Sequence, residues 1–341
     1  MPEYFTLPRE DQREALLVAA ERSGRPPHLL GKDVWVVWAL HHLFTGPHAP
    51  HLVFKGGTSL SKAYGVIKRF SEDVDLTYDI RAIAPDLIEK ADSPWPTSRN
   101  QDKKWTKAIR QRLAELVSGN LAPDLAKALA EQGLPAKARA EGELIFIDYE
   151  AFGEGTGYVR PSVLLEFGAR STGEPNELRP VACDAAPHLP DVSFPSATSQ
   201  VMRPERTFWE KATAIHVYCA QGSFRSGDRY ARHWHDVTRL DAVGFADSAA
   251  RDRALALAVA EHKSIFFAES MPDGAPIDYR AAVTGALDLA PSGDARKTLA
   301  EDYQRMVEDG LLLDDAEPFD VLLQRCQALA LNVNAAALGA A

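Results

Sequence analysis

The feature that most constrains this 341-residue chain is a strand, a glycine turn and a helix in direct succession, followed shortly by a second strand. The apolar run over 51–55 stops at Gly56-Gly57, and the residues after it have helical spacing. Two glycines leave no side chain at the turn, so a phosphate group can approach the backbone closely. The following helix presents free N–H groups and its positive end, while Thr58 and Ser59 add hydroxyl donors. We therefore expect an anion-binding turn here.

The second strand carries two carboxylates. Residues 73–78 read Asp-Val-Asp-Leu-Thr-Tyr, and this strict alternation predicts a strand. Side chains two positions apart in a strand share one face, so Asp73 and Asp75 lie side by side while Val74 and Leu76 face the core. Adjacent carboxylates repel each other unless a cation lies between them. Hard oxygen ligands suit Mg²⁺ or Mn²⁺, and Mg²⁺ usually takes one or two protein carboxylates together with substrate phosphates.

The combination is more informative than either part. A lone Asp-x-Asp pair is most often a solvated strand face, whereas a glycine turn with Asp73 and Asp75 close behind it is a specific pattern. A phosphate-binding turn next to a divalent-metal site is what phosphoryl or nucleotidyl transfer requires. The Walker pattern G-x-x-x-x-G-K-[ST] is absent, so this is a different kind of nucleotide site.

The remainder of the chain predicts an α+β fold, in which a small mixed sheet is flanked by helices. We expect an N-terminal helical segment over 1–50, the sheet core over 51–175, and a helical C-terminal domain over 200–341 that ends in an acidic tail. Within the core, 144–147 and 163–167 are strand candidates that form a hairpin.

Three further segments receive predictions from composition and spacing. Residues 58–67 and most of 81–142 are predicted to be helical. Residues 171–200 are rich in proline and serine, which favours a loop or linker.

Charge at first argues against a nucleic-acid partner, because the formal net charge is −10. The acidity is concentrated in the tail: residues 241–341 hold 8 basic and 17 acidic side chains, whereas residues 1–240 hold 30 and 31. A global charge does not exclude a local basic groove.

Two basic stretches are candidates for binding nucleic-acid phosphates, with a solvated helix face as the alternative for each. The first consists of Arg99, Lys103, Lys104, Lys107, Arg110 and Arg112, with Trp105 among them. The second consists of Arg225, Arg229, Arg232 and Arg239.

Cysteine usage and the N-terminus favour a cytoplasmic protein. Cys183, Cys219 and Cys326 lie far apart, which argues against a zinc knuckle or a disulfide framework. The N-terminal residues lack the pattern of a secretory signal, and no apolar run approaches the length of a membrane span. We therefore expect no membrane partner.

Four segments together resemble the AbiEii/MenT nucleotidyltransferase toxins, within the DNA polymerase β-like nucleotidyltransferase superfamily. They are Phe54-Lys55-Gly56-Gly57-Thr58-Ser59-Leu60 with Arg69-x-Ser71-x-Asp73-x-Asp75-Leu76, then Val163–Arg170, Arg206–Ala212 and Arg232–Val237. The resemblance covers about residues 50–240. It implies that the glycine turn, with Lys62, Arg69 and Ser71, binds the nucleotide, and that Asp73 and Asp75 bind the metal.

The resemblance also implies a third carboxylate, Glu166. It lies inside the apolar run Val163–Phe167, and a buried carboxylate needs a metal or a base such as Arg170 as its partner. The alternatives are that Glu166 faces water on an edge strand, or that Asp148, at the end of the neighbouring strand, takes this place.

Two later residues complete the expected site. Lys211 lies at the edge of an apolar helical stripe, so it either reaches a neighbouring cleft as a counter-ion for a triphosphate or extends to solvent. The resemblance favours Asp236 as a site residue. His233, His235 and Asp236 form a weak metal-ligand pattern, and we expect instead that Asp236 bonds an arginine or lysine.

Taken with the resemblance, these residues predict transfer of a nucleoside monophosphate from an NTP to an acceptor, with release of pyrophosphate. The resemblance implies the tRNA 3′ end as acceptor, growth arrest as the outcome and a cognate antitoxin encoded elsewhere. Two alternatives stay open: nucleotidylation of a protein target, and a catalytically weak module that binds a nucleotide or an antitoxin.

Overall fold

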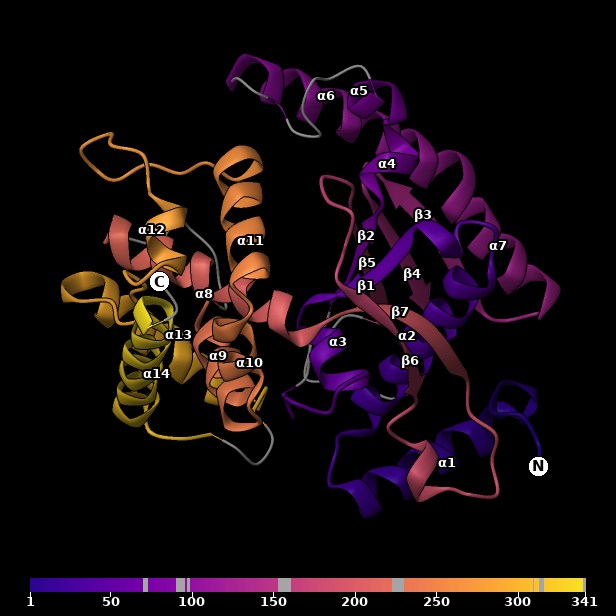
Figure 1. The fold of residues 1–341 in the computed structure, drawn as a ribbon. Helices are drawn as coiled ribbons and strands as arrows, with labels where there is room; N and C mark the ends of the chain where they lie inside the picture. The colour runs from indigo at the N-terminus through magenta and orange to yellow at the C-terminus, as the bar shows by residue number, and fades with distance from the viewer. Residues whose placement is uncertain are drawn as a thin grey trace. The chain divides into compact units, whose positions relative to one another are not determined.

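The structure is a computed structural model that describes residues 1–69, 73–89, 96, 99–152, 161–222, 230–308, 310–312 and 316–339. It has the mixed α+β class predicted from the sequence (Figure 1). The chain divides into two compact units. Unit 1 holds Met1–Ala63, Ser71–Asp92 and Lys104–Met202, and unit 2 holds Tyr64–Phe70, Ser93–Lys103 and Arg203–Ala341. The linear division at 50, 175 and 200 stays a prediction.

Among the described residues, a seven-stranded mixed sheet forms the centre of unit 1, in the order β3-β4-β5-β2-β1-β7-β6 (Figure 1). The pairs β2–β5 and β1–β7 are parallel, and the other neighbours are antiparallel. The strands are β1 (Leu52–Lys55), β2 (Asp73–Tyr78), β3 (Ala136–Glu141), β4 (Leu144–Tyr149), β5 (Ser162–Gly168), β6 (Asn176–Ala182) and β7 (Ser196–Met202). The four strands predicted from the sequence, including the β4–β5 hairpin, are confirmed.

Helices cover this sheet, and the most buried of them is α2 (Pro27–Thr45), which packs against β5 and β7. It lies within the N-terminal segment predicted to be helical, and its central residues from Val34 to Leu40 are all buried. The other helices of unit 1 are α1 (Arg9–Ser23), α3 (Gly56–Lys62), α4 (Ile80–Ile83), α5 (Pro85–Glu89), α7 (Ala122–Glu131) and most of α6 (Arg99–Leu116). A π-helical turn over Val117–Leu121 joins α6 to α7, and 3-10 turns occupy Tyr4–Thr6, Ala49–His51 and Ala186–His188.

Three sequence predictions for unit 1 are wrong in part. The segment 171–200 is no linker, because β6 and β7 form an antiparallel hairpin there. Pro180 is compatible with this pairing because β6 is an edge strand, where a missing N–H is tolerated. Residues 136–141 form β3 rather than helix: their alternating burial suits pairing with β4, which overrides their helix propensity. The helix predicted over 58–67 spans only Gly56–Lys62.

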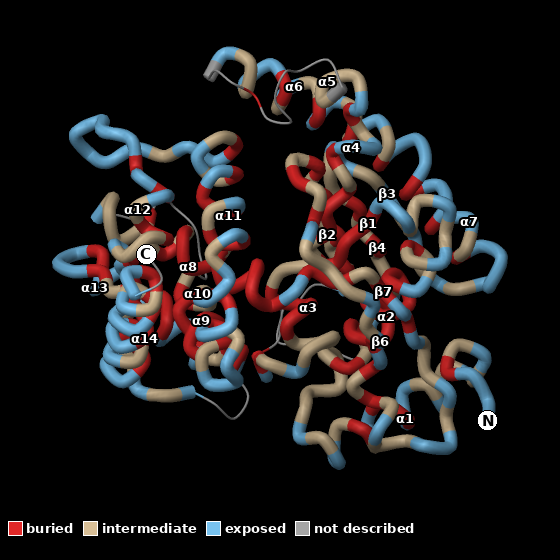
Figure 2. Tube along the Cα trace, viewed as in Figure 1, coloured by how far each residue is buried: buried red, intermediate tan, exposed pale blue. Residues whose placement is uncertain are grey.

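Unit 2 is helical in its described part, as predicted for the C-terminal region. Its helices are α8 (Pro204–Gln221), α9 (Ala231–Ala242), α10 (Phe245–Arg251), α11 (Arg253–Phe266), α12 (Tyr279–Val283), α13 (Gly293–Glu308) and α14 (Phe319–Gly339). Helix α8 is buried along most of its length and contacts α9, α10, α11 and α12 (Figure 2). None of the described helices is long and apolar enough to cross a membrane.

Candidate active site

The three predicted carboxylates lie on one face of two adjacent strands in unit 1. Asp73 and Asp75 are two positions apart on β2 and both are half-buried, whereas Val74 and Leu76 between and after them are fully buried. The Cα atoms of Asp75 and Glu166 are direct partners in the parallel β2–β5 pair. Paired residues point to the same side of a sheet, so the register brings Glu166 to the carboxylate face. Glu166 lies on an interior strand and is half-buried, so the edge-strand alternative is wrong.

The alternative third carboxylate, Asp148, lies at a different level of the sheet. Its Cα pairs with that of Ser162, four positions before Glu166 on β5. Its Oδ2 accepts a hydrogen bond from Arg139 Nε at 2.7 Å. Burial would raise the pKa of Asp148, but the nearby Ser162 hydroxyl and the hydrogen bond and charge of Arg139 outweigh it and lower that pKa. Asp148 is thus engaged with its own strand neighbours, and the register favours Glu166.

One residue on this face did not enter the predicted site: Lys55. Its Cα pairs with that of Asp75 in the antiparallel β1–β2 ladder, so Lys55, Asp75 and Glu166 follow one another across three strands on one face. Its position as the last residue before the glycine turn is the sequence feature that could have indicated Lys55 as a site residue.

The glycine turn is packed directly against the second aspartate. Gly56 has a φ of 77°, and a Cβ atom built on it would lie 2.0 Å from Asp75 Oδ2 and 2.8 Å from Asp75 Cγ. A left-handed backbone and a missing side chain are therefore both required for Asp75 to occupy its position. The turn and the carboxylate strand form a single structural unit.

The hydroxyl groups of the turn are engaged with backbone oxygens. The Thr58 hydroxyl donates a short hydrogen bond to the carbonyl of Asp73, and Ser59 Oγ donates to the carbonyl of Gly56 at 2.9 Å. Both side chains are buried, as is Gly57. The Thr58 hydrogen bond fixes the turn relative to β2, whereas the Ser59 hydrogen bond lies within the turn itself. The backbone of Gly56 and Gly57 is what the turn offers to a phosphate.

Lys62, predicted from the sequence to bind the nucleotide, forms two ion pairs within unit 1. Its Nζ lies 2.6 Å from Asp33 Oδ1 and 2.7 Å from Asp184 Oδ1, and its side chain is 6% exposed. Asp184 is also paired with Arg25. Burial alone would lower the pKa of Lys62, but the two carboxylates outweigh it and raise that pKa. Lys62 therefore ties α3 to α2 and to the residue that follows Cys183.

Unit 2 contains a second group of predicted site residues around Asp236. Arg69 donates from Nε to Asp236 Oδ1 at 2.7 Å and from Nη2 to Oδ2 at 2.8 Å. Lys211 Nζ, on α8, lies 2.9 Å from Asp236 Oδ2. The Asp236 side chain is completely buried on α9. The prediction that Asp236 bonds an arginine or lysine is confirmed, and both kinds of partner are present.

The charged groups in this cluster shift one another's pKa values. Burial would raise the pKa of Asp236, but Arg69 and Lys211 hold it well below its usual range. The pKa of Lys211 is lowered, chiefly by burial and further by Arg69 and Arg232, although Asp236 opposes the shift. The pKa of His233 is lowered well below its usual value, chiefly by burial and further by the charges of Lys211, Arg232 and Arg69. In physical terms, the described cations around Lys211 outnumber the carboxylate, so an additional anion would be favourable there.

The described residues contain no preformed cluster of three His, Cys, Asp or Glu side chains that could hold a metal ion. His235 Nδ1 faces Asp236 Oδ1 at 3.4 Å, and its Nε2 faces Arg239 Nε at 3.4 Å, so neither nitrogen is directed at a metal. The donor set of Asp73 and Asp75 nevertheless fits Mg²⁺ that arrives with a nucleotide, because phosphate oxygens then complete the coordination. Ser71, predicted to bind the nucleotide, lies outside the described residues.

The second basic stretch is also only partly described. Arg225 and Arg229 lie outside the described residues. Arg239 Nη2 lies 3.3 Å from Glu317 Oε1, so Arg239 has a carboxylate partner within unit 2.

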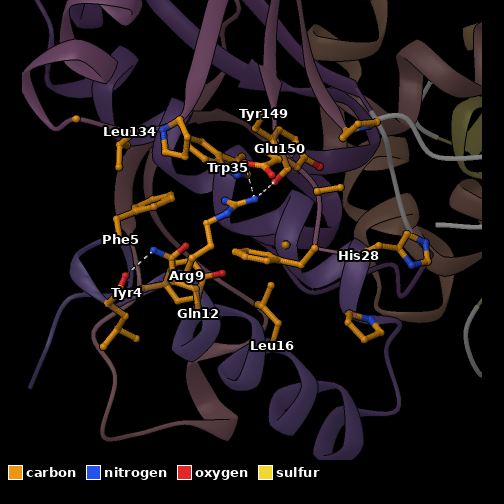
Figure 3. Close-up of a pocket in the computed structure, with 18 residues that line it drawn as sticks. Tyr4, Phe5, Arg9, Gln12, Leu16, His28, Trp35, Leu134, Tyr149 and Glu150 are labelled. Atoms are coloured by element: carbon orange, nitrogen blue, oxygen red, sulfur yellow. Dashed lines mark hydrogen bonds and ion pairs between the residues drawn. The ribbon is translucent and has the colours of Figure 1, made fainter. Parts of the chain in front are cut away.

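A separate cavity of about 460 Å³ in unit 1 is lined by none of the predicted site residues (Figure 3). Aromatic side chains form part of its walls: the rings of Trp35 and Tyr149 stack at 5.5 Å, and the ring of Phe5 lies 4.7 Å from that of Trp35. Arg9 pairs with Glu150 at 2.9 Å. The cavity does not mark the carboxylate face.

A mixed sheet with a glycine turn packed against a carboxylate strand is the arrangement expected from the sequence for a nucleotidyltransferase. The family model described as the nucleotidyl transferase AbiEii toxin of type IV toxin–antitoxin systems matches residues 38–325. The chain belongs to this AbiEii family of nucleotidyltransferase toxins.

Three solved structures of similar proteins come from two bacteria. MenT4, a nucleotidyltransferase toxin from Mycobacterium tuberculosis H37Rv, is 18% identical, with a TM-score of 0.44 over 95% of this chain and 98% of that chain. JHP933 from Helicobacter pylori is 14% identical, with a TM-score of 0.38 over 90% of this chain and 91% of that one. A putative nucleotidyltransferase from H. pylori is 14% identical, with a TM-score of 0.43 over 93% and 99%. A search of curated protein sequences gives no match.

Proposed function

We propose that this toxin transfers a nucleoside monophosphate from an NTP to the 3′ end of tRNA, in a reaction that depends on Mg²⁺ or Mn²⁺, and thereby arrests growth. The observation that carries the proposal is the face formed by Asp73, Asp75 and Glu166 with the Gly56 turn packed against it. The proposed acceptor rests on the family and on the presence of basic side chains in an otherwise acidic chain.

Each part of the carboxylate face has a proposed role. Asp73 and Asp75 hold the metal, which when bound neutralises phosphate charge and orients the triphosphate. The attacking 3′ hydroxyl oxygen forms a bond to the α-phosphorus, the bond from that phosphorus to the bridging oxygen breaks, and pyrophosphate leaves. Glu166 completes the carboxylate set and accepts the proton of the attacking hydroxyl. The backbone N–H groups at Gly56 and Gly57 bind phosphate oxygens.

The cluster in unit 2 has the chemistry of a phosphate counter-ion. Lys211 and Arg69 supply the positive charge that a triphosphate requires, and Asp236 positions them rather than taking part in the chemistry. The lowered pKa of Lys211 is consistent with this role, because a bound anion would offset the neighbouring arginines. We propose that the reaction takes place in the cytoplasm and that a cognate antitoxin controls it, as the type IV system implies.

The test is an incubation of the purified protein with each labelled NTP, Mg²⁺ or Mn²⁺, and either deacylated tRNA or a lysate protein fraction. We expect label on the tRNA 3′ end, and none with Asp73→Ala or Asp75→Ala. Label on protein alone would show that the acceptor is a protein side chain. Unchanged labelling or toxicity in the Asp73→Ala variant would refute the enzymatic role of this face.

A further inference from the structure

One exposed face of α6 carries four cations, Lys103, Lys104, Lys107 and Arg110, which we term the α6 basic stripe. Positions 103, 107 and 110 follow helical spacing of four and three residues, so they form a row, and four residues correspond to about 6 Å along the helix axis. Within the part of the chain that the structure describes, the three lysines make no ion pair. Their ammonium groups are therefore available to a partner.

The opposite face of α6 fixes the orientation of the stripe. Trp105, Ile109 and Leu113, four residues apart, are buried at 5%, 1% and 0% exposure. Arg112 of the same helix pairs with Asp86 on α5. Because Trp105 is buried, it does not stack on bases, and the surface that α6 presents is cationic rather than aromatic. A surface of this kind recognises phosphates without reading a sequence.

One end of the stripe lies beside the turn that precedes β4, at the level of Glu166 and Asp75 along the sheet of unit 1. Arg110 Nη2 lies 2.9 Å from Glu143 Oε2. Glu143 directly precedes Leu144, whose Cα pairs with that of Glu166, which in turn pairs with Asp75. Neighbouring strands are about 4.8 Å apart, so only about 10 Å of sheet separates β4 from β2.

We propose that the α6 basic stripe binds the phosphate backbone of the acceptor nucleic acid and leads its end toward the carboxylate face. The charge argues for this occupant: in a chain with a net charge of −10, three exposed lysines that make no ion pair among the described residues, gathered on one helix face, oppose the general repulsion of a polyanion. Lysine suits this task because it acts as a mobile point charge. The inference deepens the proposed function, since it assumes that the acceptor is a nucleic acid.

Binding of deacylated tRNA is measured across a salt series with Asp75→Asn protein, which blocks transfer during the titration. The stripe variant adds Lys104→Glu and Lys107→Glu. A matched control adds Lys127→Glu and Lys137→Glu, two exposed lysines of unit 1 on α7 and β3, which change the net charge equally. We expect the stripe variant to lose two phosphate contacts. Its plot of log affinity against log salt concentration should then be less steep by about 1.5–2, and its binding at 0.15 M salt should be about tenfold weaker. Circular dichroism melting of all variants checks that the fold is retained.

The outcomes separate this inference from the proposed function. A stripe variant that binds tRNA with the same affinity and salt slope as the control refutes the inference, even if the wild-type protein labels tRNA. If wild-type protein labels only protein acceptors while tRNA binding still depends on the stripe, the proposed acceptor is wrong and the stripe remains a nucleic-acid site. If both the stripe variant and the control lose binding equally, net charge alone governs affinity and the inference fails.

Discussion

Gly56→Ala is the substitution that most directly tests the link between the glycine turn and the carboxylate strand. The added Cβ would lie 2.0 Å from Asp75 Oδ2, whereas real Cβ atoms almost never approach another atom closer than 3.0 Å. Asp75 Oδ2 must therefore move by about 1 Å or more, or the turn must shift away from β2. Either change displaces a proposed metal ligand from the nucleotide.

The magnitude follows from two separate effects. Gly56 has a φ of 77°, and a non-glycine residue in this left-handed region costs about 1–2 kcal/mol of stability. Displacement of a reacting group by about 1 Å lowers rate by about 100-fold. We therefore expect a modest loss of stability together with a large loss of nucleotidyl transfer.

Gly24→Ala is the matched control. Gly24 ends α1 with a φ of 72°, and a Cβ atom built there meets no atom within 4 Å, so this variant has the same backbone strain without the collision. Stability is measured by urea denaturation and activity by transfer of labelled nucleotide. The reasoning is refuted if Gly56→Ala retains transfer within threefold of Gly24→Ala.

Further predictions concern the buried charges and the metal. Lys62→Met leaves Asp33 buried without its cation, so urea denaturation should show an unfolding free energy lower by about 3–5 kcal/mol, most of which Asp33→Asn recovers. If Lys62 instead binds the nucleotide, the variant raises the KM for NTP and leaves the stability unchanged. Because the pKa of Asp236 is depressed in the folded state, its ionised form stabilises the fold at pH values above the pKa of about 3.9 in the unfolded chain, and this stability is lost as the pH falls through the folded-state pKa. Asp236→Asn should remove this loss of stability in acid and lower the unfolding free energy at pH 7 by about 3–5 kcal/mol. An unchanged dependence of stability on pH would contradict the proposed ion pairing of Asp236. Chelation with EDTA abolishes transfer but leaves the melting temperature unchanged, because the described residues hold no preformed set of three metal ligands; a fall in that temperature would show a resident structural metal.

Local patterns in the sequence predicted the parts of the fold whose burial repeats at a fixed period. The alternation over Asp73–Tyr78 and the apolar run before Gly56 became β2 and β1 in the predicted positions. Strands β6 and β7 were missed because their stability comes from pairing with each other and with β1, far away in the chain. Strand β3 was missed because its alanines and charged residues also favour helix.

The candidate site divides in the same way. Asp73 and Asp75 were placed together correctly because a spacing of two residues fixes one face of a strand. Lys62 carried no sequence signal that distinguishes a phosphate ligand from a buried ion pair, since that depends on Asp33 and Asp184, which lie far from it in the chain. Trp105, which the sequence places among lysines, is buried by the tertiary structure.

The sequence by itself determined the chemistry of this protein: the carboxylate pair, the glycine turn before it and the family to which the chain belongs. These features are local, and backbone geometry alone converts their spacing into shared faces and tight turns. Only the tertiary structure decided that Glu166 rather than Asp148 lies beside Asp75, that Lys62 pairs with Asp33 and Asp184, and that Arg69 and Lys211 share Asp236 as a partner. Strand register and burial of charge depend on residues distant in the chain, so no local pattern encodes them.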